Sequence, residues 1–244
     1  MSSFNENIVE LAALDYFAEL GYLTINGALI APSELASERE DYSQVILWDR
    51  LREAAARINP GLGRRQIEQA IVKLQRAESQ SLINENLRVH DLLTKGVSVE
   101  KRERDGQLTY EHVWFIDFAN PENNDWAAIN QLTIIENKNR RPDVLVYVNG
   151  MPLALLELKN PVTENATLKS AWNQIQTYRR DIPSVFTTNV LTVISDGTSA
   201  AMSTFSGFFE HYAPWKTIDG RDVVTNRPAL EVPVSYTHLR AHET

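Results

Sequence analysis

The 244-residue sequence contains no cysteine. This absence excludes disulfide scaffolds, thiolate zinc sites and cysteine nucleophiles, and it is in keeping with a reducing cytoplasm, where we expect the protein to be located. No stretch approaches the ~18 consecutive apolar residues that a membrane-spanning helix needs. The first residues also lack the basic and apolar regions of a secretory signal. We therefore expect no contact with a membrane.

The sequence also lacks a positive net charge, because 24 Lys and Arg residues stand against 32 Asp and Glu residues. The net charge of −8 argues against non-specific coating of nucleic acid, which depends on Lys and Arg. The charges are unevenly distributed: residues 1–60 carry a net charge of −6 and residues 136–180 a net charge of +3. A phosphate-facing surface is therefore expected in the middle of the chain, although scattered solvated charges account for these counts equally well.

Helical spacing of apolar residues dominates the first third of the chain. It predicts a helix over 8–20 that ends at Gly21, a second helix that ends at Asn59–Pro60, and a third over 63–79. Short runs rich in Val, Ile, Leu and aromatic residues then indicate strands. These runs are 97–102, 108–118, 131–137, 143–148 and 153–159, followed by a helix over 163–182 and a strand over 189–197.

This order of elements predicts an α/β fold with a mixed central β-sheet flanked by helices. We expect a single domain over residues 1–230, with a helical part over about 1–90 and a sheet-containing catalytic core over about 91–230. Residues 231–244 follow no clear periodicity and are expected to be a disordered or non-native tail. His238 and His242 in this tail are four residues apart and would lie on one face of a helix. Without further ligands nearby in the sequence, they do not indicate a metal site.

Charged residues interrupt two of the apolar strands. Asp143 stands at the start of one strand, and Glu157 and Lys159 stand near the end of the next, with Asn149–Gly150 between the strands. Glu157 and Lys159 are two residues apart, so they point to the same face of a strand. A charge in an apolar strand is costly to bury unless it is paired, binds a metal or reaches a cleft.

The register of this hairpin decides whether Asp143 joins the other two charges. A two-residue turn pairs Val148 with Met151 and places Glu157 on the face opposite to Asp143. A three-residue connection pairs Val148 with Pro152 instead and places Asp143 across from Glu157. We favour the three-residue connection, because it separates the apolar side chains from the charged ones and glycine can supply its left-handed residue.

Two carboxylates and a lysine at one edge of a sheet suit a hard divalent cation. Mg²⁺ prefers oxygen ligands and is often held by one or two carboxylates together with substrate phosphates. Such a cation polarises a phosphodiester and lowers the pKa of a bound water, while the ammonium of Lys159 orients that water or balances charge. The alternative interpretation is a surface ion pair between Glu157 and Lys159, because isolated Glu-x-Lys tripeptides are common.

These residues carry a resemblance to a known family. Pro-Asp followed by Glu-Leu-Lys resembles the PD-(D/E)xK nuclease signature, and QIQTY at 174–178 is similar to the QxxxY motif of its RecB-like branch. The wider context is similar to the N-terminal nuclease region of the restriction (R) subunit of type I restriction-modification enzymes. This context comprises IDFANPENNDWAAINQ, RRPDVLVYVNGMPLALLELKNP, VISDG and PWKTIDG, and the resemblance covers roughly residues 8–220.

The resemblance implies roles for individual residues. Asp143 and Glu157 correspond to the metal ligands, with the carbonyl of Leu158 as a further ligand, and Lys159 corresponds to the catalytic lysine. Gln174 and Tyr178 lie four apart on one helical face and would reach the site or the DNA beside it, or else be a solvated residue and a packed aromatic. Related nucleases also carry a glutamate on the first helix. The candidates are Glu10, then Glu6 and Glu19, although a solvated helix face explains any one of them as well.

The resulting functional hypothesis is an endonuclease domain that cuts double-stranded DNA with Mg²⁺, or with Mn²⁺ as the alternative. Phosphate contacts are expected from four basic residues, Arg140, Arg141, Arg179 and Arg180. The sequence has no G-x-x-x-x-G-K-[ST] phosphate loop, so ATP would serve only a motor domain outside what we expect to be a fragment. Methyltransferase and specificity subunits would supply site recognition. A catalytically silent module that docks DNA or a partner subunit is the alternative function.

Overall fold

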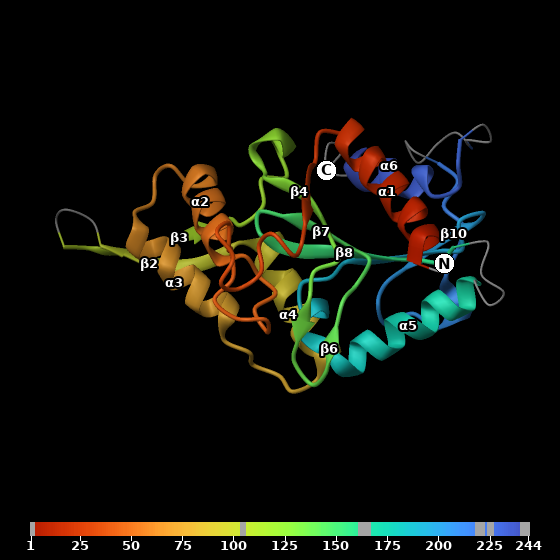
Figure 1. Cartoon of the computed structure of the whole chain (residues 1–244). Helices are drawn as coiled ribbons and strands as arrows, with labels where there is room; N and C mark the ends of the chain where they lie inside the picture. Colours follow the sequence, from red (N-terminus) through yellow and green to blue (C-terminus); the bar gives the residue numbers. More distant parts are fainter. Residues whose placement is uncertain (1–2, 103–105, 161–166, 218–222, 224–226, 240–244) are drawn as a thin grey trace.

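A six-stranded sheet forms the centre of the computed structural model, which describes residues 3–102, 106–160, 167–217, 223 and 227–239 (Figure 1). Its strands, in spatial order, are β1 (Leu23–Asn26), β4 (Trp126–Asn130), β7 (Val144–Val148), β8 (Met151–Leu158), β9 (Leu191–Ser195) and β10 (Ala200–Ser203). The pairs β1–β4 and β8–β9 are parallel, and the other neighbouring strands are antiparallel. The predicted α/β fold with a mixed central sheet flanked by helices is therefore confirmed.

Helices cover both faces of the sheet, which explains why β7 and β8 are apolar almost throughout. Helix α1 (Ser3–Glu19) packs on one face with residues such as Phe17, and α6 (Glu231–Leu239) lies beside α1 (Figure 1). Helix α5 (Leu168–Asp181) packs on the opposite face with residues such as Ile175. Because α5 connects β8 to β9 across the sheet, these two strands run parallel.

The helical part of the chain builds a separate core at one end of the sheet. Its helices are α2 (Trp48–Ile58), α3 (Arg64–Gln75) and α4 (Leu82–Lys95), which pack against the hairpin of β2 (Val97–Arg102) and β3 (Leu108–Val113). This hairpin extends away from the central sheet (Figure 1). The remaining short elements are β5 (Ile134–Ile135), β6 (Asn139–Arg140) and the 3₁₀ helices η1 (Pro121–Asn123), η2 (Pro183–Phe186) and η3 (Phe209–His211).

Most predicted helices match the structure, whereas several strands differ in extent. The first helix ends as expected, with Gly21 at φ 87° and the Tyr22 amide donating to the Phe17 carbonyl (3.0 Å). The segment 131–137 was predicted as a strand, but within it only the two residues of β5 form a strand. The longer strand β4, which belongs to the central sheet, ends just before this segment and was not predicted. Helix α4 and the edge strands β1 and β10 were not predicted. The two edge strands have only four residues each, too few to show a period in the sequence.

The segment 231–244 was expected to be a disordered or non-native tail. In the structure Glu231–Leu239 form helix α6, and Val234 is buried against the face of the sheet that α1 covers. His242 lies outside the described residues, and the domain boundary at residue 230 stays a prediction. None of the helices in the described ranges is both long and apolar enough to cross a membrane.

The turn between β7 and β8 corrects one prediction. Val148 pairs with Met151, so the connection has two residues and not three. Asn149 (φ 51°) and Gly150 (φ 79°) both occupy the left-handed region, as a type I′ hairpin turn requires. The register then shifts by one residue after the Tyr147–Pro152 pair, so that Val146 faces Ala154. A proline cannot donate to the ladder and is tolerated in sheets at such bulges.

The bulge restores the arrangement that the three-residue connection was meant to explain. Beyond it Val144 pairs with Leu156, and continuing this register places Asp143 opposite Glu157. Val144 and Leu156 face α1, whereas Leu145 and Leu155 face α5. The two carboxylates therefore belong to the face of the sheet that α5 covers.

We expect Gly150→Ala to lower the free energy of unfolding by about 2–5 kcal/mol. A Cβ at this position would lie 2.4 Å from the carbonyl oxygen of Leu47, and φ is positive. The left-handed conformation of a non-glycine residue costs roughly 1–2 kcal/mol, and overpacking costs about 1–3 kcal/mol. Chemical denaturation measures the difference. Gly61→Ala is the matched control, because a Cβ there meets nothing within 4 Å; equal stability of the two variants would contradict the prediction.

Candidate active site

Asp143 and Glu157 converge at the end of the two central strands of the sheet, where β7 begins and β8 ends. The Leu158 amide donates to Asp143 Oδ2 (2.7 Å), which holds the aspartate side chain across the end of β8. Lys159, one residue later, donates from Nζ to Glu157 Oε1 (2.5 Å). The structure therefore brings together the three residues that the sequence singled out.

Glu157 is buried to an unusual degree for a carboxylate. Its residue is only 1% exposed, its Oε2 atom makes no hydrogen bond of normal geometry, and the Tyr178 hydroxyl interacts with the same carboxylate more weakly. Burial and, next, the charge of Asp143 raise the pKa of Glu157 to about 8, against the opposing effect of the Lys159 ammonium. Below about pH 8 the metal-free site therefore keeps a proton on Glu157, and a bound cation would take the place of that proton.

The oxygen atoms at this site fit a small divalent cation. Mg²⁺ takes oxygen ligands and keeps several waters, so two carboxylates are a sufficient protein contribution. The unpartnered Oε2 of Glu157 lies in the same cluster as Asp143, and the carbonyl of Leu158 lies in the chain between Glu157 and Lys159. No group of three or more His, Cys, Asp or Glu side chains that could hold a metal occurs in the described ranges. A cation here would therefore depend on water or phosphate for its remaining ligands.

Helix α5 lines a hollow together with the segment that precedes Asp143. Gln174 and Tyr178 line this hollow of about 380 Å³, and residues 139–141 of the segment before Asp143 line it as well. Burial, then the charges of Glu157 and Asp143, raise the pKa of the Tyr178 hydroxyl. The effect of both charges on its pKa shows that the Tyr178 hydroxyl lies near the two carboxylates. Gln174 lies on the same face of α5 as Tyr178, as their spacing of four residues predicted.

Glu10 lies near this edge of the sheet but is engaged in other contacts. Its carboxylate accepts hydrogen bonds from the side chains of Asn130 (2.6 Å) and Gln131. The main-chain amide of Gln131 in turn donates to the main-chain carbonyl of Asp143 (3.0 Å). Glu10 is thus linked to the site through the end of β4, and a role as metal ligand stays a prediction. Of the competing glutamates, Glu19 is exposed at the end of α1, and the side chain of Glu6 lies outside the described part of the chain.

The four arginines that were predicted to contact phosphate differ in their surroundings. Arg140 and Arg180 both bind the carboxylate of Asp181, with Nε distances of 2.7 Å and 2.8 Å. Arg179 donates to the side chain of Gln176 and lies over the ring of Phe205, whereas Arg141 is exposed at the hollow. The structure brings only Arg140 and Arg141 to the hollow itself, and the DNA contacts of all four stay predictions.

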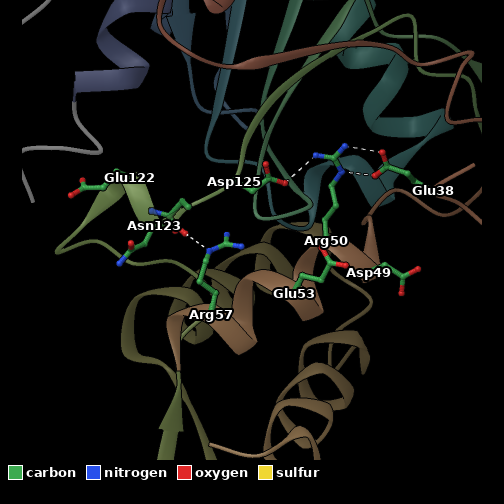
Figure 2. Close-up of a pocket in the computed structure, with 9 residues that line it drawn as sticks. Glu38, Asp49, Arg50, Glu53, Arg57, Glu122, Asn123 and Asp125 are labelled. Carbon is green, nitrogen blue, oxygen red and sulfur yellow. Dashed lines mark hydrogen bonds and ion pairs between the residues drawn. The ribbon is translucent and has the colours of Figure 1, made fainter. Parts of the chain in front are cut away.

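A larger hollow of about 650 Å³ lies away from these residues, between α2 and η1. Figure 2 shows Arg50 among the residues that line it, with the guanidinium bound to Glu38 on one side and to Asp125 on the other. These ion pairs connect the helical part to the start of β4. Because Arg50 is already fully paired with carboxylates, this hollow is best explained as a structural joint.

Three residues around the site were missed in the sequence: Asn130, Gln131 and Asp181. Asn130 ends β4, a strand that was not predicted, and Gln131 follows it, at the start of a segment that was predicted to be a strand but begins with a bend. Asp181 carried a signal, because an acidic residue in the last turn of a helix opposes the helix dipole and needs a nearby cation. The adjacent arginines and Asp181 together would have indicated an ion-pair cluster.

Comparisons with known proteins agree with the resemblance seen in the sequence. A family described as "Type I restriction enzyme R protein N terminus" matches residues 3–207. The type I restriction enzyme HindI endonuclease subunit of Haemophilus influenzae is 34% identical over 220 residues, which cover 89% of this chain and 21% of that protein. A Methanocaldococcus jannaschii protein named "Putative type I restriction enzyme MjaIXP endonuclease subunit" is 29% identical over 228 residues, which cover 91% of this chain and 22% of that protein. The chain thus spans about a fifth of the length of these curated relatives.

Proposed function

Since this chain belongs to the family of type I restriction enzyme R protein N termini, we propose that it cleaves phosphodiester bonds of double-stranded DNA with Mg²⁺ or Mn²⁺. One observation carries the proposal: a buried glutamate with an unpartnered oxygen lies beside a second carboxylate and a lysine. A structural ion pair needs only one carboxylate for the lysine. Two adjacent carboxylates favour binding of a proton or of a cation, and a divalent cation would replace the proton that Glu157 otherwise keeps.

The proposed chemistry divides among the residues of the cluster. A divalent cation, when bound, would polarise the scissile phosphate and lower the pKa of a bound water. Asp143 and Glu157 would hold the cation, with the carbonyl of Leu158 as a further ligand. The ammonium of Lys159, held by Glu157 Oε1, would orient the attacking water and balance the charge that develops on the phosphate. Gln174 and Tyr178 would bound the hollow through which the DNA backbone approaches.

Basic residues near the hollow support DNA as the substrate. Arg141 is exposed at the hollow, and Arg140 and Arg180 together bring two positive charges to the single carboxylate of Asp181. Contacts of this kind position a duplex without reading its bases. Sequence recognition and ATP-driven translocation would then come from methyltransferase and specificity subunits and from other parts of the R subunit.

Metal binding tests the proposal directly. We expect Mn²⁺ and Mg²⁺ to raise the melting temperature of the chain, because binding to the folded state alone stabilises it. Asp143→Ala should abolish this rise, since one of two carboxylate ligands is lost. The control is Asp91→Ala, which removes an exposed carboxylate that pairs with Lys95 on α4.

Two results would count against a metal-dependent nuclease. A wild-type chain whose melting temperature does not respond to either cation would leave the site without its physical basis. An Asp143→Ala variant that responds as strongly as wild type would place the cation elsewhere. Either result would favour the alternative of a silent module that docks DNA or a partner subunit.

A further inference from the structure

Asp181, at the end of α5, is the buried centre of an ion-pair cluster whose two arginines are partly exposed. Its residue is 1% exposed. Oδ2 accepts hydrogen bonds from Nε (2.7 Å) and Nη2 of Arg140, and Oδ1 accepts one from Nε of Arg180 (2.8 Å). The Arg180 and, next, Arg140 guanidinium groups lower the pKa of this carboxyl to about 2. Asp181 therefore stays ionised throughout the range in which the protein would work.

The main chain at Asp181 contacts the same neighbouring segment. The carbonyl of Asp181 accepts hydrogen bonds from the amides of Asn137 (3.0 Å) and Lys138 (3.3 Å). The side chain of Asn137 donates to the carbonyl of Arg180 (2.9 Å). Main-chain and side-chain contacts thus join the last turn of α5 to residues 137–140.

The contacts of Asp181 connect two segments that both contribute to the candidate site. Residues 137–140 lead within three residues to Asp143, whereas α5 carries Tyr178 one turn before Asp181. Residues 139–141 and Tyr178 line the same hollow. The Asp181 carboxylate is buried, whereas the Arg140 side chain is 30% exposed, so the carboxylate end of this pair is held by the surrounding structure and is screened less than a fully exposed pair. The contacts at Asp181 therefore join the two segments that line this hollow.

We propose that Asp181 is a positioning residue, which through Arg140 holds the start of β7, and with it Asp143, against α5. The proposal deepens the proposed function, because Asp143 is there a metal ligand. Asp181 itself need not touch the cation or the DNA. Its effect would reach the site through the position of the Asp143 carboxylate.

The Leu158 amide reports that position without any metal, because it donates to Asp143 Oδ2 (2.7 Å). We expect Asp181→Asn to speed hydrogen exchange of this amide about tenfold, measured residue by residue by NMR on the 244-residue chain. The asparagine keeps the size but presents an NH₂ group to one of the two arginines. Arg140→Gln removes the ion pair between Arg140 and Asp181 by changing the partner that is more exposed to solvent, and it should speed exchange at Leu158 to a similar degree.

Glu38→Gln is the matched control. It removes a carboxylate that pairs with Arg50 at the joint between α2 and the sheet (Figure 2). The control should lower stability without selectively speeding exchange at Leu158. In Mn²⁺ titrations of the same variants, followed by melting temperature, only Asp181→Asn and Arg140→Gln should need more Mn²⁺ for half of the effect.

The outcomes separate the two proposals. Unchanged exchange at Leu158 in Asp181→Asn and Arg140→Gln would overturn the positioning role, as would equal acceleration in Glu38→Gln. A wild-type chain that shows no response to Mn²⁺ would instead overturn the metal site. In that case exchange at Leu158 still decides whether Asp181 positions Asp143.

Discussion

Replacing Glu157 with glutamine is expected to lower the rate of DNA cleavage at least about 10²–10³-fold, the loss seen when one preorganised electrostatic group is removed from an active site. Glutamine keeps the size and one acceptor oxygen but removes the negative charge. A cation held by the remaining carboxylate alone would neither be bound tightly nor be placed correctly. Cleavage of plasmid DNA by the R subunit that carries this chain, assembled with its partner subunits, measures the loss.

The same variant should be more stable than wild type in the absence of metal. Burial raises the pKa of Glu157 from its ordinary 4.5 to about 8, so between these pH values the folded state keeps a proton that the unfolded state has lost. Wild-type stability therefore falls as the pH rises through this window, whereas the glutamine variant is unaffected. The difference in melting temperature should widen from about pH 4.5 to 8 and stay constant above.

Added Mg²⁺ should reverse the order at pH 8, because it stabilises wild type and not the variant. The control is Glu122→Gln, which neutralises an exposed glutamate of the larger hollow in Figure 2 and should change neither property. Cleavage by Glu157→Gln at the wild-type rate, whatever its melting temperature, would rule out an essential role for this carboxylate.

Lys159→Ala is expected to lower cleavage about 10²–10⁴-fold, the usual contribution of a positioned group that assists proton transfer. Binding of Mn²⁺ should persist, because both carboxylates remain. Lys159 is held against Glu157, so its ammonium is fixed relative to the proposed cation. Nicking of plasmid DNA by the assembled complex measures the loss, and a separate assembly assay shows whether the complex is intact.

The matched control for this variant is Lys169→Ala. Lys169 lies on the first turn of α5, with its ammonium 3.8 Å from the centre of the Trp172 ring, away from the carboxylates. Its removal should leave cleavage unchanged. If Lys159→Ala and Lys169→Ala nick DNA equally well, Lys159 has no catalytic role.

The hairpin that carries the site shows what the sequence could and could not predict. The polar residues in apolar strands indicated correctly that Asp143, Glu157 and Lys159 share one edge. The predicted length of the turn was wrong, although Asn-Gly is the strongest short sequence signal for a two-residue turn. The compensating bulge depends on distant contacts, since the Leu153 carbonyl accepts from the Val190 amide (2.7 Å). Such contacts cannot be deduced from the hairpin sequence.

The surroundings of the site were less predictable than its centre. The arginines were expected to face DNA, but the sequence gives no distance between Arg140 and Arg180, which lie 40 positions apart. Only the fold places both on Asp181. Helix α4 was overlooked, although Val89 and Leu93 are four positions apart and are buried in the core of the helical part. Tertiary packing, and not local propensity, decides these elements.

The type I′ hairpin has a consequence for how the site is assembled during folding. Asp143, Glu157 and Lys159 belong to one continuous stretch of chain, and hairpins of this kind form within roughly 1–10 μs, long before distant segments meet. The two like charges and the ammonium that offsets one of them thus arrive together. Gln174 and Tyr178 can join only after α5 has crossed the sheet. A chain that has formed this hairpin but has not yet docked α5 would therefore already hold the pair of carboxylates but lack the side chains of α5 that line the hollow.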